Sequence, residues 1–213
     1  MVKAALMAGA DRTATQLATQ YTVNTANGLN NVYGAGQLNI YNSYHIIAAG
    51  EQNSREDLLS ANGEIQHVGF DYDPYFGGLN GSNKTGTYVF KALSTGSLAA
   101  SLVWNLAVNS KFDGTATLNN LGLYLYDTTT STMLASATSL VDNTENIWYT
   151  SLTAGDSYLL EVASLQATDF FWDYGLAWNI NATTTHAPLP PTVYLLGSGI
   201  VAMVLLRRKK RVR

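Results

Sequence analysis

The side chains that most often carry chemistry are scarce in this chain. It has no cysteines, which excludes disulfides, thiol catalysis and cysteine-ligated metal centres. The three histidines, His45, His67 and His186, lie far apart, and no two of them have the spacing of metal ligands. No glycine-rich phosphate loop and no pair of catalytic carboxylates stands out. The sequence therefore predicts no metal, no cofactor and no catalytic residue.

Two aspartates raise the question of a cation site. Asp71 and Asp73 flank a tyrosine in GFDYDPYFGGLNGSNKTG and could be taken for calcium ligands. The further oxygen ligands and the bidentate glutamate of an EF-hand loop are missing from this spacing. We interpret the stretch as an exposed turn built by Asp73-Pro74 and Gly77-Gly78.

Aromatic side chains offer another kind of site, a platform on which the apolar faces of sugars stack. Aromatic residues at alternating strand positions more often form core contacts or cross-strand pairs. Two tyrosines of LGLYLYD are better candidates for exposure, because they are out of phase with its three leucines. The segment ATDFFWDYG adds a tryptophan and a tyrosine beside Asp169 and Asp173. The candidate ligand contacts are Trp172, Tyr174, Tyr124 and Tyr126.

The charge of the chain argues against one class of partner. Its net charge is -3, but six of the twelve basic residues lie in residues 207–213. The rest of the chain holds six basic and fifteen acidic residues, a net charge of about -9. Because such an acidic body repels phosphates, we predict no binding to nucleic acid.

The elements that must position these side chains are mostly strands. From residue 86 to 182, apolar and polar residues alternate with period two, and turn clusters separate seven short runs. This pattern predicts an antiparallel jelly-roll-type β-sandwich in a mainly β chain. Residues 51–85, which are polar and rich in Gly and Asn, are expected to be a linker. One predicted strand places on a single face Leu98, Ala100, Leu102, Trp104 and Leu106.

Two short helices are expected within residues 1–50. Apolar and small residues recur at helical spacing near the start, at Val2, Ala5, Leu6 and Gly9. A second helix is expected after Asn39, a plausible N-cap, and should stop at Gly50. Its predicted apolar face is formed by Ile40, Tyr44 and Ile47.

The residues of these helices resemble the closing segment of a subtilisin-like serine protease domain. In VKAALMAGADRTAT…VYGAGQLNIYNSYHIIAAGE, a helix precedes a Tyr-Gly-x-Gly turn at residues 33–36, then Asn39 and a final helix. The resemblance covers about the first fifty residues and implies that 1–50 are the C-terminal remnant of such a domain. The alternative is any helix–turn–helix that ends an α/β domain.

The catalytic motifs of that family are missing. Its nucleophile motif Gly-Thr-Ser-Met-Ala, which lies upstream of this helix, does not occur here, and neither do the Asp and His motifs. A Ser-His-Asp mechanism needs all three groups, so we predict no hydrolysis by this chain. We interpret Met1 as the start of a fragment, which would also explain why MVKAALMAGADRTATQ lacks a secretory signal. Residues 1–50, without their usual parallel sheet, should pack loosely or dock on the sandwich.

The predicted sandwich resembles the bacterial pre-peptidase C-terminal domain and related domains that follow secreted proteases. The resemblance rests on the runs at residues 102–105, 121–127, 152–162 and 174–178. It implies a non-catalytic domain that aids folding, secretion or substrate contact.

The C-terminal stretch HAPLPPTVYLLGSGIVAMVLLRRKKRVR joins a polar stalk (183–191), an uncharged run (192–206) and a basic tail (207–213). Fifteen residues of helix would span about 22 Å, short of a bilayer but usable with thinning and snorkelling. The stalk and the charges argue against a buried core helix, so we predict a transmembrane helix with a cytoplasmic C-terminus. The basic stop consists of Arg207, Arg208, Lys209, Lys210 and Arg211.

The order of motif, apolar run and basic end resembles the PEP-CTERM sorting signal of Gram-negative bacteria. Pro188, Leu189 and Pro190 stand where the family usually has Pro-Glu-Pro, and the leucine departs from that pattern. The resemblance implies an exosortase-type processing enzyme and an inner-membrane intermediate. It also implies cleavage near the prolines and delivery to the cell envelope or an extracellular exopolysaccharide matrix.

The sequence thus predicts the non-catalytic C-terminal portion of an exported subtilisin-like serine protease. One alternative is a stand-alone surface binding module or matrix adhesin that uses the sandwich and contacts exopolysaccharide. A second alternative is an enzyme with an unfamiliar site.

Overall fold

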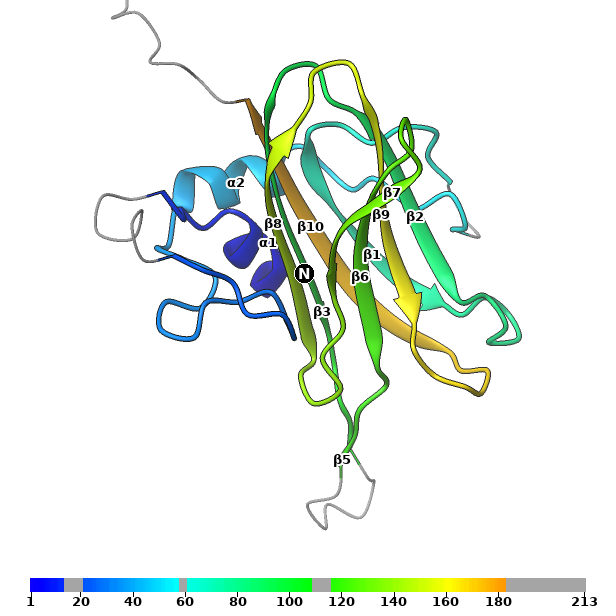
Figure 1. Cartoon of the computed structure of the whole chain (residues 1–213). Coiled ribbons are helices and arrows are strands. Elements are labelled where there is room, and N and C mark those ends of the chain that lie inside the picture. The colour runs from blue at the N-terminus through cyan, green and yellow to red at the C-terminus, as the bar shows by residue number, and fades with distance from the viewer. Residues whose placement is uncertain (14–20, 58–60, 109–115, 183–213) are drawn as a thin grey trace, which may run out of the picture. The chain divides into compact units, whose positions relative to one another are not determined.

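The chain folds around two antiparallel sheets of four strands each (Figure 1). The computed structural model describes residues 1–13, 21–57, 61–108 and 116–182. The first sheet is ordered β1 (Val68–Phe76), β10 (Trp172–Ala182), β3 (Gly96–Trp104) and β8 (Thr144–Leu152). The second sheet is ordered β2 (Thr85–Lys91), β9 (Ser157–Ser164), β6 (Leu121–Asp127) and β7 (Thr132–Ala137). A short pair lies apart from both: β4 (Ala107–Val108) and β5 (Ala116–Thr117).

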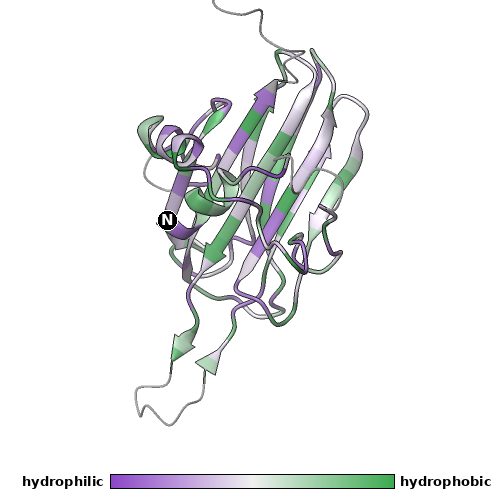
Figure 2. Cartoon of the chain, turned by 90° about the vertical axis from the view of Figure 1, so that its left-hand side faces the viewer, coloured by the Kyte–Doolittle hydropathy of each residue, from purple (hydrophilic) through white to green (hydrophobic). Residues whose placement is uncertain are grey.

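The β-sandwich predicted from the period-two pattern is confirmed. Each of the seven expected runs forms one of the sandwich strands, and all pairs within the two sheets are antiparallel. Alternation places one set of side chains between the sheets, where they form the main core. The residues predicted for one face of β3 lie in this core from Leu98 as far as Trp104. Leu106 lies beyond the end of the strand and is 44 % exposed. Figure 2 shows the alternation along the strands as bands of hydrophilic and hydrophobic colour.

Two short helices cover the outer face of the first sheet (Figures 1 and 2). α1 (Val2–Ala8) presents small side chains to β3 and β10, and α2 (Ile40–Ala48) lies against α1 and β1. They form a second core, which contains Ala4, Ala5, Ala8, Ile46, Val103 and Ala177. Of the two expected outcomes for residues 1–50, docking on the sandwich is therefore the one observed.

The apolar face predicted for α2 does not face the core. The side chain of Asn39 accepts a hydrogen bond from the Asn42 N–H at 3.0 Å, so the predicted N-cap is confirmed. The buried residues of the helix are Ser43 and Ile46. The face predicted to be apolar is exposed instead: Ile40 is 63 %, Tyr44 65 % and Ile47 46 % exposed.

The linker expected at residues 51–85 contains a strand of the sandwich, and this corrects the predicted boundary. β1 pairs with β10 from Val68 to Phe76, with a register shift between Asp73 and Phe76. The polar residues that suggested an exposed turn point between the sheets, and Asp71 is fully buried. The sandwich therefore begins at Val68, well before the expected residue 86.

Non-strand segments cover the outer edges of both sheets. Along β1, the Gln52 N–H donates to the Phe70 carbonyl at 2.8 Å. Along β2, the N–H groups of Arg55 and Ile65 donate to Thr87 and Val89. At the opposite edge, the Asn146 N–H of β8 donates to Asn27, and the Thr138 N–H after β7 donates to Ala26. Backbone groups that edge strands would otherwise expose are thereby paired.

The predicted membrane segment, residues 192–206, lies outside the described residues. Within the described part of the chain, no helix is long and apolar enough to cross a membrane.

Candidate functional site

Two of the four candidate aromatic residues lie together on the outer face of the second sheet. Leu121, Leu123 and Leu125 of β6 point into the core, so Tyr124 and Tyr126 point away from it, and both rings are half-buried. Their ring centroids are 6.2 Å apart and their planes differ by 21°. Both tyrosines thus lie on the outer side of the sheet, the orientation that their phase against the leucines predicted.

The Tyr124 ring is packed against the sheet beside it. Gly122 lies two residues before Tyr124 on the same face of β6, and it has no side chain to hold the Tyr124 ring away from the strand. A Cβ atom at that position would lie 2.9 Å from Cε2 of Tyr124 and 3.1 Å from its hydroxyl oxygen. The glycine therefore leaves room for the ring of Tyr124 to lie close over the strand at this position.

The strand register determines which residues flank the two rings. Tyr124 is paired with Glu161 of β9 on one side and Ser136 of β7 on the other. Tyr126 is paired with Leu159 and Met133 in the same way. We call this set the tyrosine face; it comprises Tyr124, Tyr126, Met133, Ser136, Leu159 and Glu161.

An open depression of about 370 Å³ adjoins the tyrosine face where β6 turns into β7. It lies between Tyr126, Leu159 and Glu161 on the sheet and the turn that follows Asp127. The Asp127 carboxylate accepts the N–H groups of Thr129 and Thr130 at 2.7 and 3.1 Å, which fixes the turn. Ser131, at its end, has a φ of 57°, in a region that residues other than glycine seldom adopt.

The electrostatic environment of the tyrosine face is acidic. Partial burial raises the pKa of Glu161, and the nearby carboxylate of Glu56 raises it further. Burial also raises the pKa of Tyr124 and of Tyr126, with a contribution from the negative charge of Glu161 in both cases. Glu56 itself accepts hydrogen bonds from the Thr87 N–H and hydroxyl at 2.6 and 2.7 Å.

Tyr174 is not a ligand contact, contrary to the prediction. It is 1 % exposed in the main core, and its hydroxyl is hydrogen-bonded to that of Tyr88. The Tyr88 hydroxyl donates in turn to Oδ2 of Asp71 at 2.6 Å. The alternation of β10 turns Tyr174 inward together with Leu176 and Trp178, which the loop-like sequence ATDFFWDYG concealed.

Asp71 and Asp73 are buried carboxyls and not an exposed turn. Burial raises the pKa of Asp71 to about 7, although hydrogen bonds from Tyr88 and the Ser54 N–H oppose the shift. Burial likewise raises the pKa of Asp73 to about 6. Oδ1 of Asp71 has no hydrogen-bond partner among the described residues, so a negative charge on this carboxyl would be poorly stabilised. In the described ranges, no three His, Asp or Glu side chains come together in a way that could hold a metal ion.

A third buried carboxyl lies at the opposite edge of the first sheet. Glu145 of β8 is fully buried, and burial raises its pKa to about 8, with the Asp142 carboxylate adding to the shift. Its Oε1 accepts the Ser139 N–H at 2.6 Å, whereas its Oε2 has no partner among the described residues. Such a group is stable in the interior only when it is neutral.

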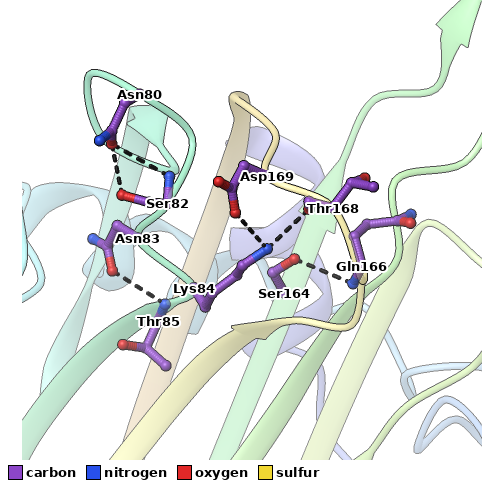
Figure 3. Close-up of polar contacts among 9 residues, drawn as sticks. All are labelled: Asn80, Ser82, Asn83, Lys84, Thr85, Ser164, Gln166, Thr168 and Asp169. Carbon is purple, nitrogen blue, oxygen red and sulfur yellow. Dashed lines mark hydrogen bonds and ion pairs between the residues drawn. The ribbon is translucent and has the colours of Figure 1, made fainter.

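Trp172 lies at one end of the sandwich and apart from the tyrosine face. Its indole N–H donates to the Asn105 carbonyl at 3.0 Å, and its ring packs partly against the main core. Figure 3 shows the polar contacts between two loops at that end, where Lys84 reaches both Asp169 and the Thr168 carbonyl, at 3.1 and 2.9 Å. Exposed rings of Tyr75 and Phe171 pack together nearby, with centroids 5.8 Å apart. The structure therefore does not bring the four predicted contacts into one site.

Sequence reasoning missed Glu161 and Leu159, because they belong to the tyrosine face only through the pairing of β6 with β9. The alternation within SYLLEVA does mark both residues as outward-facing, but nothing local indicates which strand lies beside them. Of the histidines, His45 is exposed on α2, and the ring of His67 contacts the Lys91 carbonyl. The remaining predicted residues, His186, Pro188–Pro190 and the basic stop, lie outside the described residues.

No protein-family model matches this chain, and no curated protein sequence matches it either. Among solved structures, similarity is found to PliG of Aeromonas hydrophila, a periplasmic inhibitor of g-type lysozyme, with 16% identity and a TM-score of 0.34. That match covers 55% of this chain and 94% of PliG. A protein of Sulfurospirillum deleyianum matches with 11% identity and a TM-score of 0.30, over 53% of this chain and 97% of its own. The Yersinia pseudotuberculosis-derived mitogen matches with 13% identity and a TM-score of 0.28, over 49% and 97%. These likenesses are too low to carry an argument about function.

Proposed function

We propose that this chain is the non-catalytic C-terminal part of an exported subtilisin-like serine protease, and that a PEP-CTERM-type tail sorts it to the cell envelope or matrix. In this proposal, residues 1–50 end the protease domain, and the sandwich is an accessory domain that packs directly against it. The tail passes through the inner membrane, is cleaved by an exosortase-type enzyme and leaves the folded body outside.

The observation that carries the proposal is the exposed apolar face of α2. Ile40, Tyr44 and Ile47 recur at the spacing of one helix face, yet all three are largely exposed, and Tyr41 is 71 % exposed. Apolar side chains gathered on one helix face normally cover another layer of structure. In a subtilisin-like domain that layer would be the rest of the protease, which this sequence does not contain.

The docking of α1 supports the second half of the proposal. Its alanines pack on Val103 of β3 and Ala177 of β10 and are buried there. The helical segment thus has two sides: one is buried on the sandwich, and the other is exposed among the described residues, where a further domain could pack. A segment of this kind would hold the accessory domain at a fixed place on the protease.

The strand order supports a jelly-roll type of sandwich. The chain passes between the two sheets at nearly every strand and closes with β1-β10-β3-β8 facing β2-β9-β6-β7. Two interleaved Greek keys produce such an order, and jelly rolls are common among non-catalytic binding domains.

The decisive experiment is to sequence the DNA upstream of the Met1 codon and to isolate the protein made from the whole reading frame. We expect an in-frame Gly-Thr-Ser-Met-Ala segment upstream. In the longer protein, amide hydrogen exchange in α2 should be slower than in the 213-residue chain, because its apolar face is then covered. An in-frame stop codon directly upstream, preceded by a ribosome-binding site of its own at Met1, would contradict the proposal.

A second candidate function is a stand-alone surface binding module, and the tyrosine face favours it. Two half-buried aromatic rings beside a carboxyl, on a sheet face that no described helix covers, form a surface suited to a ligand. The two proposed functions use the same sandwich. They differ in whether a protease domain covers the exposed face of α2.

A further inference from the structure

No described helix covers the outer face of the second sheet, on which the tyrosine face lies. By contrast, α1 and α2 cover the outer face of the first sheet (Figure 1). Its outward residues on β2, β6 and β9 are half-buried, which in a surface sheet means that they are packed by neighbours and open above. At its centre lie Tyr124, Tyr126 and Glu161.

We propose that the tyrosine face binds an uncharged saccharide chain, which stacks on Tyr124 and Tyr126 and is hydrogen-bonded by Glu161 and by the turn after Asp127. The site requires only the sandwich, so it holds whether the chain is part of a protease or a module by itself.

The geometry of the two rings suits a sugar. A pyranose ring carries C–H bonds on its flat faces, and their partial positive charge is attracted to the negative face of an aromatic ring. Gly122 leaves room for the ring of Tyr124 to lie close over the sheet, where the ring stays partly open to solvent. The two rings, stacked with planes that differ by 21° and centroids 6.2 Å apart, form one aromatic strip along β6 that a sugar ring can contact.

The polar groups around the strip match the hydroxyl groups of a saccharide. The Glu161 carboxyl and the Ser136 hydroxyl flank Tyr124 on opposite sides, so acceptors stand at both edges of the ring. The depression of about 370 Å³ beside Tyr126 ends at the Thr128–Ser131 turn. The Thr128 hydroxyl there donates to the Ser157 carbonyl at 2.8 Å and can still accept a hydrogen bond. A sugar lying there would leave few of its hydroxyl groups without a partner.

The charge of the face selects an uncharged ligand over other partners. Glu161, Glu56 and Asp127 outnumber the two cations along β2, Lys91 at its end beside Ser157 and Arg55 beside Thr87. Nucleic acids, anionic lipids and acidic polysaccharides would all be repelled by this charge. An amphipathic helix would need a wide apolar groove, whereas Thr87, Ser136 and Glu161 interrupt the apolar residues here.

The test is isothermal titration calorimetry of the full 213-residue chain, held in a detergent without a sugar head group, with four defined oligomers. Cellohexaose, mannohexaose and chitohexaose are uncharged probes, and hexagalacturonate is the acidic counterpart of matched length. We expect binding of at least one uncharged probe and none of hexagalacturonate. Tyr124→Ala and Tyr126→Ala should each weaken that binding at least tenfold, and Glu161→Gln should weaken it by less.

Tyr75→Ala is the matched control, because Tyr75 is an exposed tyrosine, 47 % accessible, at the loop end near Phe171. It should leave the affinity unchanged. Far-UV circular dichroism and the melting temperature of each variant show whether the fold is intact. The proposal is overturned if none of the three uncharged probes binds, if hexagalacturonate binds equally well, or if binding survives the double change Tyr124→Ala, Tyr126→Ala. None of these outcomes depends on what covers α2. A failure of saccharide binding would therefore leave the proposed protease origin untouched, and the reverse also holds.

Discussion

Buried carboxyls without a cationic partner are the unusual residues of this protein. Asp71 and Glu145 are both fully buried, and neither forms an ion pair with a described residue. A carboxylate that leaves water without a counter-charge becomes protonated, because the neutral form loses less solvation energy. Burial accordingly raises the pKa of Asp71 to about 7 and that of Glu145 to about 8.

These two pKa values predict that the folded protein loses stability as the pH rises. The unfolded chain releases both protons at about pH 4, whereas the folded chain keeps them until the pH passes about 7 and 8. The stabilisation is therefore complete below about pH 4 and declines up to about pH 8. Asparagine cannot ionise. We therefore expect the free energy of unfolding of Asp71→Asn to fall less between pH 5 and 8 than that of the unaltered protein, by on the order of 2 kcal/mol.

Urea denaturation at a series of pH values measures this effect. Asp169→Asn is the control, because Asp169 is exposed and paired with Lys84 at the surface, where the expected effect is small. A pH profile of Asp71→Asn that parallels the unaltered protein would show that Asp71 ionises normally in the fold.

The four candidate aromatic residues divide into core and surface, and truncation should separate them. Tyr174→Ala removes a ring that is 1 % exposed from the main core and should destabilise the fold by about 3–5 kcal/mol. Tyr124→Ala removes a half-buried ring from the outer face of the sheet and should cost about 1 kcal/mol or less. Thermal melts followed by circular dichroism distinguish the two, and equal losses for both variants would contradict the placement of Tyr174.

At the scale of the element, the alternation of apolar and polar residues predicted those strands that have this pattern. Each core leucine of β6 and each core residue of β9 follows the period-two pattern, so both strands were identified. β1 was missed because its inward positions hold Gly69, Asp71 and Asp73, with Pro74 close by, and these residues are typical of turns. Partners from elsewhere in the chain, such as Tyr88, are what permit carboxyls at those positions.

The two helices meet at a glycine, where a single methyl group should matter. A Cβ atom on Gly9 would lie 2.6 Å from Oγ of Ser43 and 2.8 Å from its backbone nitrogen, although the φ of -76° is ordinary. Gly9→Ala should therefore push α2 away from α1 and cost about 1–3 kcal/mol by overpacking. Hydrogen exchange in α2 measures the loosening.

Gly63→Ala is the matched control for this change. No atom lies within 4 Å of the position that its Cβ would take, so it should be neutral. If both variants behave alike, the close approach of the helices at Gly9 does not stabilise the protein.

At the scale of the whole molecule, the candidate site could be predicted only in part. The phase of Tyr124 and Tyr126 against the leucines of β6 is a local property, and it identified the pair. That Glu161 flanks Tyr124, and that Trp172 lies on the other sheet, depends on which strands become neighbours. Strand order arises from long-range packing and crossovers, which the local pattern does not encode.

The proposed route to the cell surface makes a prediction about the tail. If Pro188–Pro190 direct cleavage, the protein recovered from the envelope of the source bacterium should end near these prolines and lack the basic stop. Changing Pro188 and Pro190 to alanine should leave the tail attached and the protein in the inner-membrane fraction. Intact mass spectrometry of both fractions tests this, and an envelope form that retains Arg213 would contradict it.

The covered sheet edges have a consequence for any shortened form of the protein. Segments before residue 68 pair with β1, β2 and β8 and with the residue after β7, so all four edges depend on the same stretch of chain. A variant starting at residue 67 would keep both core layers of strands but expose every edge at once. Such a species is a template for strand addition, and we expect it to polymerise into thioflavin-positive fibrils rather than remain a monomer. The N-terminal segment would then be what keeps the sandwich from self-assembly.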